Sequence, residues 1–298
     1  MKPLDFLMGV TVAVTWGMGL TFAKVGMDQF PPIMLIALRF TVTALALVWF
    51  VKPPLGMMWR IFIVSFVIGT VQYSLTFTGL SGLDVSLAAI IIQMEVPFAT
   101  LMAVIFLGDR LGAWQTAGMA VAFAGVVIIA GQPSEQSNIS SLFLVLGGTL
   151  TWAYGNILVK KLGKSLGGFQ LIAWVAVFTA PQLFIASFLL EDGQMDALAN
   201  ADMVGWGTVF YLGLVMTAFG YGLWFHLVAH NPVSHVMPFL LLLPVAAGAG
   251  GILMLGEAPT WRTIGGAILV LSGVALILYR QMRKTGNIPA APQAVPPD

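Results

Sequence analysis

Residues 15–24 read TWGMGLTFAK, and a related decapeptide, TWAYGNILVK, follows 136 positions later at residues 151–160. Both copies have Thr, Trp, Gly and Lys at the same spacing, and each lies near the end of a long uncharged run. Two copies of one unit would fill the 298 residues. Internal repetition therefore guides the interpretation of the whole chain.

Further landmarks return in the same order, with slips of one residue. They are Val85-Ser86 with Val233-Ser234, Pro97 with Pro244, Gly108-Asp109 with Gly256-Glu257, and Trp114-Gln115-Thr116-Ala117-Gly118 with Trp261-Arg262-Thr263-Ile264-Gly265. Four landmarks in one order argue against a chance match. They predict a first repeat at residues 1–131 and a second at 132–284.

The composition is that of a membrane protein. Hydrophobic residues make up 59% of the chain and charged residues 8%, against about 25% charged residues in soluble domains. Asp, Glu, Lys and Arg are absent from residues 6–23, 61–83, 111–134, 136–159, 165–190 and 203–256. Because about 20 apolar residues cross a bilayer, these runs predict an all-α, polytopic protein.

Charges, Pro and Gly divide the chain into ten expected spans. These are residues 4–25, 32–51, 59–79, 84–107, 113–130, 140–161, 168–190, 203–229, 234–255 and 261–279. The first is interpreted as a retained helix, because no small-residue cleavage site follows it. Residues 285–298, with four prolines, are expected to form a disordered cytoplasmic tail.

Lys and Arg predict the orientation of these spans. With the N-terminus inside, ten basic residues fall on the inner side, and Lys24, Arg39 and Arg262 remain outside. Both termini are therefore expected in the cytoplasm. Five spans per half is an odd number, so the second half must be inverted relative to the first. Inverted repeats are typical of alternating-access transporters, whose binding site lies near the midplane.

The sequence also resembles a known family, the EamA-type ten-helix branch of the drug/metabolite transporter superfamily, over roughly residues 5 to 280. The motifs that carry this resemblance are Trp16-Gly17 with Lys24, Pro32 with Leu38-Arg39-Phe40, Gly108-Asp109-Arg110-Leu111 with Gly118 and Gly125, Trp152, Gly155-Asn156, Lys160-Lys161, Pro244, Gly256-Glu257 and Gly265. Within the family, the chain is most similar to bacterial exporters of O-acetylserine, cysteine and aromatic amino acids.

The resemblance implies a basket of ten helices in a bacterial cytoplasmic membrane, with the third, fourth, eighth and ninth helices lining a central cavity. Two positions depart from the family pattern. Asp109 stands where Glu is usual, and Ala258-Pro259 replaces a basic-apolar pair. Both departures lie at helix ends and concern loop detail. Independently of the resemblance, Asp109 and Glu257 are expected to stabilise the positive end of the helix that follows each of them.

Glu95 and Arg39 are candidates for chemistry inside the membrane. Glu95 lies midway along a span, where a carboxylate is costly and marks a functional position by default, and Pro97 can open the helix beside it. It could carry a proton, while Arg39 could bind a substrate carboxylate bidentately. The alternative is a structural ion pair between the two, and the roles can coexist.

Other polar and aromatic residues complete the expected binding site. The aromatic candidates are Trp16, Tyr73, Phe77, Trp152, Tyr221 and Trp224, which could attract an ammonium group by cation–π contact. Gln72, Gln93 and Asn156 could bind substrate or bridge helices. Lys24 and Lys160 lie at opposite mouths and either gate the path or extend to the interface. Aromatic residues equally serve packing or anchoring.

Composition and motifs exclude several other classes. A net charge of +1 gives no field for nucleic acid, and the absence of cysteine excludes disulfides and thiolate metal sites. His226 and His230 share a helical face, but Leu227 replaces the Glu of a metalloprotease helix, so no metal is expected. Without a phosphate-binding Gly-x-x-x-x-Gly-Lys loop, neither ATP nor another cofactor is expected.

The function expected from these observations is a secondary transporter that exports amino acids or related small metabolites by alternating access. Its partners would be the substrate, a possible proton and membrane lipid. One alternative is an intramembrane hydrolase that uses Ser81, expected in a short connector, or His226 and His230. A second alternative is a passive facilitator of the same fold. The substrate, the proton coupling and the oligomeric state stay open.

Overall fold

The computed structural model describes residues 2–108, 112–130, 138–162, 166–231 and 233–286, and their regular elements are helical. The first half contains α1 (Pro3–Gly26), α2 (Pro32–Leu47), η1 (Val48–Phe50), η2 (Leu55–Met57), α3 (Met58–Ser65), η3 (Phe66–Val71), α4 (Gln72–Ser81), α5 (Val85–Ile92), α6 (Glu95–Leu107) and α7 (Ala113–Ala130). The second half contains α8 (Ile139–Leu162), α9 (Gly168–Leu190), α10 (Gln194–Asn200), α11 (Met203–Phe210), η4 (Tyr211–Phe219), α12 (Gly220–His230), α13 (Val233–Val236), η5 (Met237–Leu242), α14 (Leu243–Leu255) and α15 (Trp261–Gly286).

Ten stretches within the described residues are long and apolar enough to cross a membrane. They coincide with the ten spans predicted from sequence, which are numbered 1 to 10 in chain order below. α15 continues to Gly286, past the predicted start of the tail, and residues 287–298 lie outside the described part. Large apolar side chains such as Trp49, Phe50 and Trp59 face outward, as expected for contact with lipid.

Spans 3, 4, 8 and 9 depart from a continuous α-helix, and span 2 ends in the 3-10 helix η1. Spans 3 and 8 each contain a π-helix, η3 and η4. Span 4 breaks at Gln93 and Met94, so that Glu95 begins α6 and Pro97 lies in its first turn. Span 9 begins with the short helix α13 and the 3-10 helix η5 before α14. Such irregular backbone is tolerated at membrane depth where it is buried in protein or lines a cavity.

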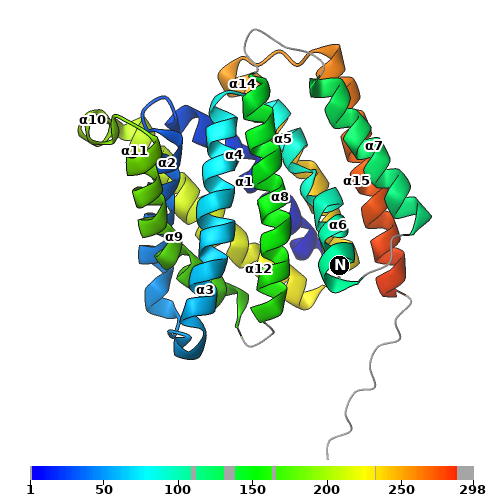
Figure 1. Ribbon diagram of the computed structural model, residues 1–298, viewed down its shortest axis with the longest axis horizontal. Helices are drawn as coiled ribbons and strands as arrows, with labels where there is room; N and C mark the ends of the chain where they lie inside the picture. Colours follow the sequence, from blue (N-terminus) through cyan, green and yellow to red (C-terminus); the bar gives the residue numbers. More distant parts are fainter. Residues whose placement is uncertain (1, 109–111, 131–137, 163–165, 232, 287–298) are drawn as a thin grey trace, which may run out of the picture.

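Helix contacts confirm the two inverted repeats. Exchange of the halves maps span 1 onto span 6, span 2 onto span 7, and so on. α1 packs on α12, η4 and α14, as α8 packs on α4, η3 and α6; α2 packs on η4 as α9 packs on η3. The pairs α2–α9, α5–α14 and α7–α15 map onto themselves. Figure 1 shows α7 and α15 side by side at one edge of the bundle.

Small residues let α7 and α15 approach closely. A Cβ atom at Gly118 would lie 2.7 Å from the carbonyl oxygen of Gly273, and one at Gly125 would lie 2.7 Å from that of Gly266. Any side chain at these positions would push the two backbones apart. Close backbone approach through small residues is a common way to associate helices in a membrane.

Polar contacts gather several helix ends at one end of the bundle, called the Lys24 end below. The opposite end, where α8 finishes, is called the Lys160 end. Glu191, after α9, accepts hydrogen bonds from the first amides of α2, at 2.7 Å from Ile33 N. Asp202 caps α11 and accepts a hydrogen bond from Gln29 at 2.6 Å. The Gln29 contact and the α11 amides lower the pKa of the Asp202 carboxyl.

Candidate functional site

A cavity of about 480 Å³ lies between the two repeats. All eleven residues expected from sequence line it: Trp16, Arg39, Gln72, Tyr73, Phe77, Gln93, Glu95, Trp152, Asn156, Tyr221 and Trp224. Spans 1, 2, 6 and 10 contribute to the lining as well as spans 3, 4, 8 and 9, which the resemblance implied. The volume is within the range of sites for small molecules, which is about 300–1,000 Å³.

Several lining residues were not expected from sequence. They include Leu20, Thr76, Thr149, Met216, Met237 and Leu240. Thr76 and Thr149 lie on helices that already carried candidates, so helical spacing from Gln72 and Trp152 was an available signal. Met216 lies in the π-helix η4, whose residues also fit a regular α-helix, so their pattern gives no signal of the distortion.

Arg39 is buried beside the cavity, with 1% of its surface exposed. Its Nε donates a hydrogen bond to Thr217 Oγ1 at 3.0 Å, and its Nη2 lies 3.5 Å from the Tyr73 hydroxyl. The guanidinium carbon is 5.3 Å from the Phe40 ring centre and 5.0 Å from that of Tyr73. Nη1 has no hydrogen-bond partner. An unpaired buried cation of this kind is costly unless an anion binds it.

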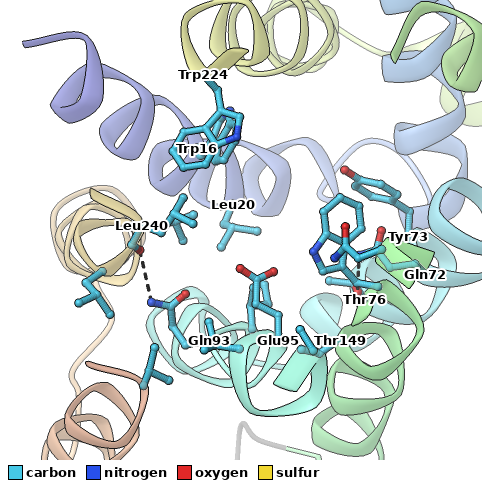
Figure 2. A pocket seen from close by; sticks show the side chains of 18 of the residues that line it. Trp16, Leu20, Gln72, Tyr73, Thr76, Gln93, Glu95, Thr149, Trp224 and Leu240 are labelled. Atoms are coloured by element: carbon cyan, nitrogen blue, oxygen red, sulfur yellow. Dashed lines mark hydrogen bonds between the residues drawn. The ribbon is translucent and has the colours of Figure 1, made fainter. Parts of the chain in front are cut away.

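Glu95 presents its carboxylate to the open part of the cavity (Figure 2). It begins α6, directly after the break at Gln93 and Met94, so the break places it at the positive end of a helix. Trp152 lines the same cavity. The partners described for Arg39 are hydroxyls and rings, so the direct Arg39–Glu95 ion pair left open by the sequence is not formed.

Aromatic side chains form one wall of the cavity. The ring centre of Trp16 lies 4.8 Å from that of Tyr221 and 5.5 Å from that of Trp224. The Trp16 indole donates a hydrogen bond to Met216 O at 3.1 Å, which fixes its orientation. In Figure 2, Trp16 and Trp224 lie across the cavity from Tyr73. This wall offers π faces to an apolar or cationic group.

The three amide residues differ in their contacts. Gln93 bridges two helices, since its Nε2 donates to Leu240 O at 3.3 Å. Gln72 donates to Thr76 Oγ1 at 3.1 Å, and its Oε1 has no partner. Asn156 is exposed on the cavity lining. Of the three, Gln72 has a buried oxygen without a partner, and Asn156 is the one exposed.

Lys24 links α1 to the end of α4 and to the connector that follows it. Its Nζ donates to the carbonyl oxygens of Leu80, Ser81 and Leu83 at 3.0, 2.7 and 3.0 Å. These carbonyls belong to the end of α4 and to the connector that leads to α5. We call this set of contacts the Lys24 latch. Lys160, the matching residue of the second repeat, is exposed.

Glu257 strengthens the same end of the bundle. Its carboxylate accepts hydrogen bonds from the backbone amides of Val85 and Ser86 and from the Ser86 hydroxyl. The expectation that Glu257 stabilises the helix that follows it was wrong, because the chain folds Glu257 back onto the N-terminus of α5. Asp109 lies outside the described residues. Partial burial, together with the nearby Glu257 carboxylate, raises the pKa of the Asp84 carboxyl, and Lys24 opposes this shift.

The residues of the hydrolase alternative are not brought together. Ser81 ends α4 at the Lys24 end, not in a connector as expected, and its hydroxyl donates to Thr78 O at 2.8 Å. His226 and His230 lie at the far end of α12, toward the Lys160 end, with their rings stacked at 4.2 Å. The serine therefore has no histidine beside it to act as a base.

Ten membrane-spanning stretches of the described residues, in two inverted halves around a largely apolar cavity that contains a few buried polar groups, are the architecture of a multi-pass membrane transporter. Residues 4–131 and 139–279 each match the EamA-like transporter family. The chain belongs to the EamA-like transporter family. This membership agrees with the sequence motifs and identifies a transporter, not an enzyme.

Several curated proteins are similar over nearly the full length. A probable amino-acid metabolite efflux pump of Escherichia coli (strain K12) is 29% identical, covering 96% of this chain and 100% of its own. A protein of the same description from Salmonella typhimurium is 28% identical, covering 97% of this chain and 99% of its own. A probable terminal-alkyne amino-acid exporter of Streptantibioticus cattleyicolor is 27% identical, over 92% and 93%.

One solved crystal structure is similar in three dimensions. It has a TM-score of 0.63 at 17% sequence identity and covers 96% of this chain and 99% of its own. A likeness at this identity concerns the fold alone.

Proposed function

We propose that the protein is a secondary carrier of the inner membrane that exports small amino acids or closely related metabolites by alternating access. The observation that carries this proposal is a cavity with a buried cation, Arg39, whose Nη1 has no hydrogen-bond partner, and a separate carboxylate, Glu95. A zwitterion carries both opposite charges. The names of the relatives, which refer to amino-acid metabolites, point to the same substrate class.

The substrate carboxylate is proposed to bind Arg39. Its Nη1 lacks a partner, and the 3.5 Å contact from Nη2 to Tyr73 is at the limit of a hydrogen bond. A carboxylate that takes over both nitrogens would gain a bidentate, charge-assisted pair. The ammonium group would bind near Glu95, and the side chain would pack against the wall of Trp16, Tyr221 and Trp224.

Lys24 and its repeat counterpart Lys160 suggest how the two conformations of the carrier differ. In the present conformation Lys24 is bound to carbonyl oxygens and Lys160 is exposed. Exchange of the inverted halves places Lys160 in the role of Lys24, and the end of α12 in the role of the end of α4. We expect the second conformation to release Lys24 and to engage Lys160 with the last carbonyls of α12.

The cavity lining supports the inference that this conformation is open at the Lys160 end. Met237 and Leu240 of η5 and Leu278 of α15 line the cavity toward the Lys160 end. Toward the Lys24 end, Leu80 and Leu83 are 0% and 2% exposed and close the path. With the Lys160 end and both termini in the cytoplasm, as the Lys and Arg distribution predicts, this conformation would load substrate from the cytoplasm.

Transport by purified protein in liposomes tests the proposal. A panel of labelled amino acids is compared with their decarboxylated amines, with and without a pH gradient. We expect saturable transport of one or more amino acids and weak transport of the matching amines. Equal transport of both series, or no transport of any amino acid above empty liposomes, contradicts the proposal. Transport without any response to the pH gradient indicates a passive facilitator.

The variant Glu95→Gln tests whether Glu95 carries a proton that is coupled to transport. The substitution removes the titratable group and keeps its size, while one acceptor oxygen becomes an NH₂ donor. If Glu95 carries the proton, the variant loses the stimulation of transport by a pH gradient, and the substrate exchange that remains does not respond to the gradient. The measurement is uptake with and without an imposed gradient, in parallel with substrate counterflow.

Asp196→Asn provides a matched control. Asp196 is an exposed carboxylate in α10, outside the cavity. We expect this variant to respond to the gradient as the wild type does. An unchanged gradient response in Glu95→Gln removes Glu95 from the coupling mechanism.

A further inference from the structure

We propose that Thr217 is the positioning residue that holds the Arg39 guanidinium ready for a substrate carboxylate, and that the π-helix η4 exists in span 8 to present it. This inference rests on the proposed function, because it assigns a role in carboxylate recognition. It concerns a residue that lies outside the cavity lining and acts through Arg39.

The hydrogen bonds of the Thr217 hydroxyl determine which partner it donates to and which it accepts from. Its Oγ1 donates to Leu212 O at 2.7 Å, with the one proton that a hydroxyl has. The same oxygen must therefore act as the acceptor for Arg39 Nε, at 3.0 Å. Thr217 is 2% exposed and Arg39 is 1% exposed, so water does not compete for this pair.

The π-helix makes this arrangement possible. Several buried threonines in the α-helices of this chain donate to the carbonyl four residues earlier, as Thr149 does to Val145 O at 2.7 Å. Thr217 instead reaches the carbonyl five residues earlier, that of Leu212. The wider turn of η4 allows this reach. Single π-helical turns occur frequently at functional sites.

η4 also holds α2 and α1 in register with Thr217. Thr43, one turn after Arg39 on α2, donates to Gly213 O at 3.0 Å. A Cβ atom at Gly213 would lie 3.0 Å from Arg39 O, so the glycine permits this close approach. Met216 O accepts the indole proton of Trp16 at 3.1 Å. One short segment thus positions both the cation and the main aromatic residue of the cavity.

These contacts hold the terminal nitrogens of Arg39 in place. With Nε held by Thr217 and the guanidinium packed near the rings of Phe40 and Tyr73, the side chain keeps one orientation. Nη1 then stays unpaired. A pre-organised guanidinium binds a carboxylate with less loss of side-chain entropy than a free one. Thr217 therefore contributes to the affinity for carboxylates without touching the substrate.

Thr217→Val and Thr217→Ser separate this role from a purely structural one. Valine keeps the shape and removes the acceptor, whereas serine keeps the hydroxyl. For the amino acid that the wild type transports, we expect Thr217→Val to raise KM by about 10-fold, the effect of one lost hydrogen bond to a charged group. We expect maximal velocity to change little, and Thr217→Ser to restore KM to within about 3-fold of the wild type.

Three comparisons make the test specific. The decarboxylated amine should show the same KM in Thr217→Val as in the wild type. In an Arg39→Gln background, Thr217→Val should add no further loss, because the two residues act as one unit. Thr179→Val is the matched control: Thr179 is a fully buried threonine that donates to Ser65 O beside η3, away from the cavity.

Each other outcome overturns the inference. An unchanged KM in Thr217→Val overturns the positioning role alone, provided that the wild type prefers the amino acid to the amine. An equal loss for amine and amino acid, or a loss that serine does not restore, assigns Thr217 to folding and also overturns it. If the wild type itself shows no preference for the carboxylate, the proposed function fails together with this inference.

Discussion

Arg39→Gln is expected to reduce the transport efficiency for amino acids by about 100-fold or more, because truncation of one partner of a buried charge pair costs about 2–5 kcal/mol. The glutamine cannot form the bidentate pair with a carboxylate. It also leaves Thr217 Oγ1 without its donor. The measurement is initial-rate uptake in liposomes that contain equal amounts of folded protein.

Arg39→Lys is expected to recover little of this loss. A lysine carries the charge but has neither the planar fork nor an Nε–H at the position that contacts Thr217. Arg60→Gln is the matched control, since Arg60 is an exposed arginine near the start of α3, outside the cavity. Near-normal amino-acid transport by folded Arg39→Gln would contradict the assigned role.

Lys24→Gln is expected to open the Lys24 end. The ammonium makes three hydrogen bonds to carbonyl oxygens, and hydrogen bonds to charged groups contribute about 1.5–3 kcal/mol each. Loss of a small part of this stabilisation shifts the conformational equilibrium by about 10-fold. Leu20→Cys reports the shift, because Leu20 lines the cavity about one turn from Lys24 and the chain has no native cysteine.

The measurement is the rate of Leu20→Cys labelling by an impermeant maleimide added from the Lys24 side. We expect the rate to rise by about 10-fold in Lys24→Gln, with a matching fall in net transport, because the carrier stays open at one end. Lys161→Gln serves as the control, since Lys161 is exposed at the end of α8. Equal labelling with and without Lys24 would show that the latch does not close this end.

The spans were predictable because hydrophobicity alone determines them. About 20 consecutive apolar residues have few stable arrangements other than a membrane helix, and the flanking charges marked the ends. The inversion was predictable for a related reason. Lys24 and Lys160 recur in matching motifs, and the described chain crosses the membrane five times, an odd number, between Lys24 and Lys160.

The residues that line the cavity could be chosen from sequence because polar groups deep in a span are costly unless they face a cavity or a partner. Glu95 and Gln93 fall in an otherwise apolar span, which made them visible. The contacts of these residues were not predictable. The sequence left open an Arg39–Glu95 pair, but the structure gives Arg39 the hydroxyl of Thr217.

The partners that sequence reasoning missed are mainly backbone atoms. Lys24 binds three carbonyl oxygens, and Glu257 binds two backbone amides of α5. Every residue has such atoms, so no side chain marks these positions. The π-helices η3 and η4 were not predictable for a similar reason. Their apolar and small polar residues would fit a regular α-helix equally well.

The proposed carrier mechanism depends on the inverted repeat, and single-cysteine labelling tests the inversion most directly. Asp28→Cys lies just beyond α1 at the Lys24 end, and Lys161→Cys lies at the end of α8; both positions are exposed. In intact cells, an impermeant thiol reagent should label Asp28→Cys and reach Lys161→Cys only after the membrane is opened. Labelling of both positions from the same side would contradict the inversion and the carrier mechanism built on it.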